Sequence, residues 1–82
     1  MNTPSAIPLI SGQQLKAGRV LVGLSRADLA ARSSVSVETI ARLENDERDS
    51  RIHTLRQVVG TLEASGIRFL RDGVLLQKER GT

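Results

Sequence analysis

The sequence has no cysteine and only one histidine, and these two shortages narrow the chemistry open to the chain. Without cysteine it can form neither a disulfide framework nor a thiolate metal site. His53 alone cannot complete a metal site, so we interpret it as an ordinary surface residue. No glycine-rich phosphate loop and no nucleophile–base pair stands out in the sequence. We therefore expect no enzyme activity, no metal and no cofactor.

The sequence also lacks a long apolar run. No stretch approaches the roughly eighteen residues that a membrane-spanning helix requires. Residues 1–11 contain both prolines and have no cationic region ahead of the short apolar patch at 7–10, which is not typical of a signal peptide. We expect these eleven residues to form a flexible N-terminal arm, and the protein to be cytoplasmic with no membrane partner.

What is present is a short, arginine-rich chain. Its 82 residues suffice for one compact domain, whose small core would gain from dimerisation. Lysine and arginine number 12 against 9 acidic residues, a net charge of +3, and most of the 12 are arginine. The planar guanidinium suits phosphates and base edges because it can donate two parallel hydrogen bonds. The excess is modest, so its distribution matters more than its size.

Two helices are predicted at the ends of a central domain that spans 12–66. The first covers 12–23, and Gly18 in its middle costs stability unless another element packs closely against it. The last covers 51–65, where apolar residues recur along one helical face and Gly66 suits the C-terminal cap.

Between them, two short capped helices are predicted. Ser25 caps the first, with Asp28 three residues later as in a capping box. Ser36 caps the second, which runs to Asn45. Two helices of this length joined by a three-residue turn are typical of a helix-turn-helix.

Residues 67–82 are predicted to form a β-hairpin or strand and a tail. The pair Asp72-Gly73 indicates a two-residue turn, which would place Phe69 opposite Leu76 and Leu70 opposite Leu75. Phe69, Val74 and Leu76 would then share a face that covers the helices. The other face, with Leu70 and Leu75, has nothing left to cover it. We expect it to mediate dimerisation; the alternative is a frayed tail.

The helix at 36–45 presents groups that can read DNA. With Ile40 and Leu43 facing inward at 100° per residue, the opposite face carries Glu38, Arg42 and Asn45, flanked by Val37, Thr39 and Ala41. A guanidinium, a carboxylate, an amide, a hydroxyl and methyl groups are the groups that recognise base edges in the major groove. The alternative is a plain solvated face.

The segment 24–45 resembles the helix-turn-helix of the lambda repressor/Cro family of XRE-like regulators, and the similarity extends over about 14–69. The matching residues are Ser25, Leu29, Ala30, Val35, Ser36, Ile40, Leu43 and Glu44. The segment 62–70 with its hairpin further resembles a compact subgroup with a short β extension. Arg26 stands where glutamine is common, and Ser34 where the turn usually has glycine.

The resemblance implies a mainly α, four-helix lambda-repressor-like DNA-binding domain with a short C-terminal β-hairpin or strand. It also implies roles for particular residues. Near base edges it places Ser36, Val37, Glu38, Thr39 and Arg42, and near the DNA backbone Asn45 and Arg26. Glu38 could accept from a cytosine amine or pair with Arg42. Arg48 and Arg51 could contact phosphates or remain solvated. In this family an arginine and a glutamate often pair structurally, here Arg19 with Glu44.

The expected function is that of a sequence-specific transcriptional regulator, a repressor that binds double-stranded DNA. A homodimer would present two copies of the 36–45 helix to a palindromic operator. One alternative is an antitoxin that also binds a second small protein through residues 1–11 or 67–82. Another is a protein-binding adaptor on the same scaffold, because fold does not fix function.

Overall fold

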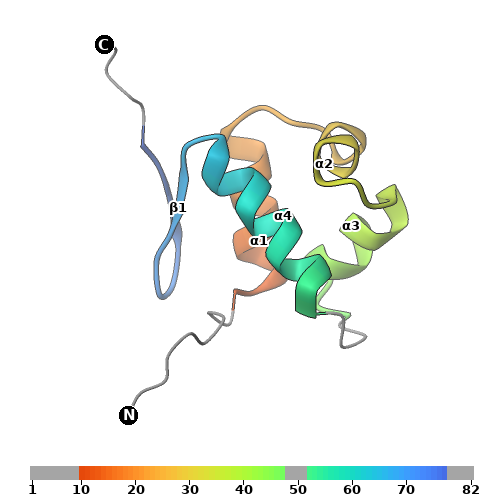
Figure 1. The fold of residues 1–82 in the computed structure, drawn as a ribbon. Helices are drawn as coiled ribbons and strands as arrows, with labels where there is room; N and C mark the ends of the chain where they lie inside the picture. Colours follow the sequence, from red (N-terminus) through yellow and green to blue (C-terminus); the bar gives the residue numbers. More distant parts are fainter. Residues whose placement is uncertain (1–9, 48–51, 78–82) are drawn as a thin grey trace.

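The computed structural model describes residues 10–47 and 52–77, in which four helices precede a short antiparallel hairpin (Figure 1). The elements are α1 (Gly12–Leu21), α2 (Arg26–Ser33), α3 (Val37–Glu44), α4 (Ile52–Ala64), β1 (Ile67–Phe69) and β2 (Val74–Leu76). The predicted fold class is confirmed, and each helix lies within two residues of its predicted bounds. None of the helices in the described ranges has the length and apolar character needed to cross a membrane.

Serine side chains start the first three helices. Ser25 accepts a hydrogen bond from the Asp28 backbone N–H, and the Asp28 carboxylate accepts one from the Ser25 backbone, which completes the predicted capping box. Ser36 accepts from the backbone N–H of Thr39. Ser11 caps α1 in the same way. These bonds satisfy backbone donors that have no partner within the helix.

The turn between α2 and α3 depends on a left-handed serine. Ser34 has φ 60° and ψ 39°, the conformation that glycine adopts most easily. Val35 follows it and donates its backbone N–H to the Ala30 carbonyl at 3.0 Å. Ala30 itself is buried within α2, where its small side chain allows close packing. The strain at Ser34 is therefore offset by a closed, hydrogen-bonded turn.

One hydrophobic core joins all four helices to β1. Its fully buried members are Leu15, Leu29, Ile40, Val58 and Leu62, and Ile10, Ala30, Leu43, Leu55 and Ile67 complete it. Ile67 packs against Gly18, where an added Cβ would lie 3.3 Å from its Cγ2 atom. Gly18 thus makes room for the hairpin. Ile10 belongs to this core and Ser11 caps α1, so the packed structure includes two residues that were assigned to the arm.

The hairpin exists, but its predicted register is wrong. Ile67 pairs with Leu76 and Phe69 with Val74, and Leu70 donates its backbone N–H to the Gly73 carbonyl at 2.9 Å. The tip is therefore one residue earlier than Asp72-Gly73. If Asp72 and Gly73 were the two central residues of a hairpin turn of the predicted type, both would have a positive φ. Neither residue has one.

The difference in register does not change which residues share each face of the hairpin. Partners shift by two residues, and side chains alternate with a period of two. Phe69, Val74 and Leu76 remain on the face that packs on the core, and each is half-buried. Leu70 and Leu75 remain on the outer face.

Candidate nucleic-acid interface

Helix α3 has one buried side and one exposed side. Ile40 is fully buried and Leu43 nearly so, and both pack into the core. Ile40 donates its backbone N–H to the Ser36 carbonyl at 3.2 Å, which continues the helix from its cap. The exposed side chains are those of Ser36, Val37, Glu38, Arg42 and Asn45, with Thr39 and Ala41 half-buried at the margins. The structure thus brings the base-edge candidates together on one short surface.

Two of these candidates also contact each other. The hydroxyls of Ser36 and Thr39 are 2.9 Å apart and share a hydrogen bond, while Ser36 also caps the helix. This bond fixes the two hydroxyls relative to α3. Val37, which follows the cap, has 46% of its surface exposed, so its methyl groups are available to an apolar partner.

Glu38 and Arg42 do not pair. The ion pairs among the described residues both involve Glu44 and not Glu38. The i,i+4 alternative for Glu38 is therefore not realised here, and the Arg42 guanidinium is exposed without an acidic partner in the described part of the chain.

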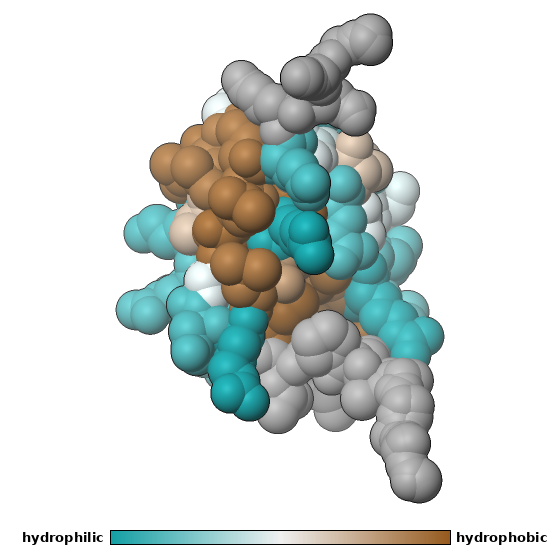
Figure 2. Space-filling model, turned by 90° about the vertical axis from the view of Figure 1, so that its left-hand side faces the viewer, coloured by the Kyte–Doolittle hydropathy of each residue, from teal (hydrophilic) through white to brown (hydrophobic). Residues whose placement is uncertain are grey.

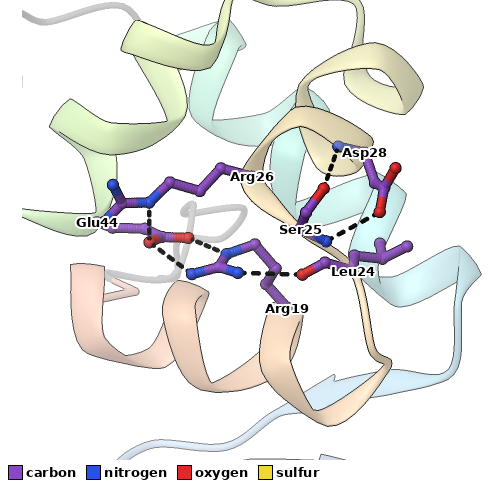
Figure 3. A network of polar contacts seen from close by, with 6 residues as sticks. All are labelled: Arg19, Leu24, Ser25, Arg26, Asp28 and Glu44. Carbon is purple, nitrogen blue, oxygen red and sulfur yellow. Dashed lines mark hydrogen bonds and ion pairs between the residues drawn. The ribbon is translucent and has the colours of Figure 1, made fainter.

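Glu44 joins three elements through one carboxylate (Figure 3). Arg19 of α1 contacts both oxygens, with Nε 2.6 Å from Oε2 and Nη2 3.1 Å from Oε1. Arg26 of α2 donates from Nε to Oε1 at 3.0 Å. Arg19 also donates to the Leu24 carbonyl at 3.0 Å. The Glu44 side chain is 1% exposed, so this contact fixes the end of α3 against α1 and α2.

The arginines keep the buried carboxylate charged. Burial alone would raise the pKa of Glu44, but the hydrogen bonds from Arg19 and Arg26 outweigh it and hold the pKa below its ordinary value. On the surface of α2, the backbone N–H and hydroxyl of Ser25 likewise lower the pKa of the Asp28 carboxyl. Both groups are ionised at neutral pH.

The start of α1 packs directly on the end of α3. An added Cβ at Gly12 would lie 2.3 Å from the Glu44 carbonyl oxygen and 2.5 Å from that of Leu43. The Gly12 backbone N–H donates to the Asp46 carboxylate at 2.8 Å. The orientation of α3 is therefore set at its C-terminal end by backbone contact as well as by the Glu44 ion pairs.

Gln14, which was not predicted, is a buried polar residue that holds the hairpin on α1. Its Nε2 atom donates to the Leu70 carbonyl at 2.8 Å and to the Gly73 carbonyl at 3.0 Å. Its Oε1 atom accepts from the Ser11 backbone N–H. The spacing Ser-x-x-Gln is a capping-box pattern that could have indicated the local bond. The contact with the hairpin has no local signal.

Four of the predicted residues remain, two arginines and two leucines. Arg48 and Arg51 are outside the described residues. Leu70 and Leu75 lie on the hairpin and are 48% and 46% exposed. Figure 2 views the molecule from the hairpin side and shows apolar side chains gathered across this face. Two further exposed apolar residues, Val20 and Leu21, lie at the C-terminal end of α1.

A comparison with protein families finds a match to this sequence. The family model described as Helix-turn-helix matches residues 15–66, which is more than half of the chain. The match begins within α1, includes α2, α3 and α4, and ends at Gly66 before the hairpin. No curated protein matches the sequence.

Proposed function

The chain belongs to the XRE-type helix-turn-helix family and is a DNA-binding transcription regulator, and from this premise we propose that it represses transcription as a homodimer on a palindromic operator. The observation that carries the proposal is the outward side of α3. Its side chains are exposed together while Ile40 and Leu43 hold the helix to the core. A short helix anchored in this way can enter the major groove.

Arg42 is the residue to which we assign the main base contact. Its guanidinium can donate two hydrogen bonds to O6 and N7 of a guanine. Val37 can contact a thymine methyl group, and Glu38, which is free of Arg42, can accept from a cytosine amine. We assign Asn45, at the end of α3, to the DNA backbone.

The outer face of the hairpin supports the homodimer. A two-stranded hairpin is unstable in isolation, and the described residues cover only its inner face. Leu70 and Leu75 are large, apolar and about half exposed on the outer face. A second copy related by a two-fold axis would cover both residues and present two α3 helices to half-sites about one helical turn apart.

Selection of duplexes from random DNA, followed by binding titrations, tests the proposal. Arg42→Ala should weaken binding to the selected duplex about 5- to 150-fold and relax the preference at one base pair, the effect of losing a bidentate base contact. Arg56→Ala, which removes an exposed arginine from α4, is the control. An equal loss on selected and random duplexes would argue against base reading by Arg42.

Two alternative functions would give different results in these binding experiments. An antitoxin would copurify with a second small protein, and a protein-binding adaptor would fail to shift any duplex at low salt. Either result would replace the repressor proposal.

A further inference from the structure

The backbone of β2 has an unpaired outer edge. Gln77, directly after β2, donates its backbone N–H to the Gly66 carbonyl at 2.7 Å. In an antiparallel pair, bonded positions alternate with positions whose N–H and C=O groups point away from the neighbouring strand. Leu75 therefore bonds to β1, whereas the backbone groups of Val74 and Leu76 point outward. The sheet formed by the described residues has two strands, so within that part of the chain these outward groups have no further strand to pair with.

The β2 edge is better suited than the β1 edge to pair with a copy of itself. Two-fold antiparallel pairing places the middle residue of a strand opposite its own counterpart. For β1 this residue is Arg68, and like charges directly opposite each other are destabilising. For β2 it is Leu75, and two leucines can pack. Pairing of β2 with β1 of the next copy would leave a free edge at each end and continue without closing.

Helix α1 carries exposed apolar residues beside this edge. In the hairpin, β2 packs against α1 and β1 against α4. Ala17, Val20 and Leu21 lie at positions i, i+3 and i+4 on one side of α1, and all are exposed. Leu21 lines the same groove as Leu76 of β2. A partner strand added to β2 would therefore bring its own helix next to this apolar side of α1.

We infer that two copies of the chain join β2 to β2 across a two-fold axis, which forms a four-stranded sheet with the two α1 helices packed together beneath it. The inference rests on the homodimer of the proposed function and names the surfaces that form it. Val74 of each copy would exchange backbone hydrogen bonds with Leu76 of the other. The two Leu75 side chains would lie side by side on the outer face.

The same arrangement covers the other exposed apolar residues on this side of the molecule (Figure 2). Val20 and Leu21 are 58% and 46% exposed, and α1 of the second copy would cover them. Leu70 lies beside Gly73, which has no side chain. Gln77 of the second copy can therefore reach across Gly73 to Leu70.

The position of α3 favours edge pairing over stacking of the two outer faces. In Figure 1, α3 lies on the opposite side of α1 and α4 from the hairpin. Edge pairing keeps both hairpins in one layer, so both α3 helices lie on the same side of that layer. Stacked outer faces would instead place the α3 helices at opposite ends of the dimer, where a single duplex could not offer them adjacent half-sites.

Amide hydrogen exchange tests the strand pairing on the unmodified protein. By NMR, the N–H groups of Val74 and Leu76 should exchange more slowly at a concentration where light scattering shows a dimer than after dilution to the monomer. The outward N–H of Phe69 on β1 should exchange equally in both samples and is the control. A dimer in which Val74 and Leu76 gain no protection would overturn the inference. A monomer at every concentration would instead overturn the proposed homodimer, on which the inference depends.

Val20→Glu tests the contact between the α1 helices. Because Val20 is exposed, the protomer should remain folded, as checked by circular dichroism, while the Kd of the dimer rises about 5- to 150-fold from burial of an unpaired polar group. Ile52→Glu, at a residue that is 54% exposed at the start of α4, should leave the Kd unchanged. Stacking of the outer hairpin faces would not involve Val20. A wild-type Kd for Val20→Glu would therefore overturn the inferred packing of the α1 helices.

Discussion

At the scale of single residues, two helical glycines make different contributions to stability. An added Cβ at Gly12 would lie 2.3 Å from the Glu44 carbonyl oxygen, whereas a Cβ at Gly60 in α4 would meet nothing within 4 Å. Gly12→Ala should therefore destabilise the fold by about 1–3 kcal/mol, because α1 must move away from the end of α3. Gly60→Ala should stabilise it by about 0.5–1 kcal/mol by restricting the unfolded chain. Urea denaturation measures both; equal stability of Gly12→Ala and the wild type would contradict the close contact.

Glu44 should make stability depend on pH in the acid range. Its pKa in the folded state is lowered, so its stabilising contribution is complete above the pKa of an unfolded glutamate, about 4.3. The contribution is lost as pH falls through the lower pKa of the folded state. Glu44→Gln should therefore be less stable than the wild type at pH 7 and should lose less stability on acidification. Urea denaturation from neutral to acid pH tests this, with the exposed Glu63→Gln as the control. If the stability of wild type and that of Glu44→Gln changed in parallel with pH, the ionised Glu44 carboxylate would not be the source of the acid sensitivity.

The sequence predicted those residue roles that depend on near neighbours. Ser25 and Ser36 are helix caps because the backbone N–H groups that donate to their hydroxyls lie three residues away, and the left-handed Ser34 stands where the turn of the family usually has glycine. The bond from Arg26 to Glu44 joins residues 18 positions apart, and no local pattern indicates it. The expectation that Arg26 lies near a DNA backbone therefore rested on a family resemblance alone.

At the scale of elements, Gln14 fixes the hairpin to α1. Its two bonds reach the carbonyls on either side of the hairpin tip. Gln14→Ala would leave these carbonyls without their donor, at a cost of about 1–3 kcal/mol. Amide hydrogen exchange in β1 and β2 should become faster than in α2 and α3. Gln13→Ala, an exposed neighbour on the same helix, is the control. Unchanged exchange in the hairpin would mean that packing of Phe69 and Val74 alone holds it.

The same contact shows why the hairpin was predicted and its register was not. Alternation of apolar residues and the Asp-Gly pair were enough to indicate two strands and their faces. The register also depends on where Gln14 can reach, and that residue is 56 positions from Leu70. The local preference of the Asp-Gly pair for a turn supplies only a fraction of the folding free energy, so tertiary contacts such as those of Gln14 can set a different register.

At the scale of the molecule, α1 connects the recognition helix to the hairpin. In Figure 1 the hairpin and α3 lie on opposite sides of α1 and α4. The N-terminal turn of α1 contacts α3 through Gly12 and the hairpin through Gln14. Movement of the hairpin relative to α3 would have to break one of these two contacts. In the proposed dimer, this connection would fix the spacing of the two α3 helices and thus the spacing of the half-sites.

Leu75 provides the test of that dimer. Because it is about half exposed on the outer face of the hairpin, Leu75→Glu should leave the fold of one protomer intact while burying a carboxylate in the proposed interface. We expect the wild type to be a dimer by light scattering and Leu75→Glu to be a monomer at the same concentration. Its affinity for a palindromic duplex should fall more than its affinity for a single half-site, because only the palindrome engages both protomers. Ile52→Glu changes an apolar residue at the start of α4 that is slightly more exposed than Leu75, and it should remain dimeric. A wild-type monomer, or a dimeric Leu75→Glu protein, would exclude this face as the interface.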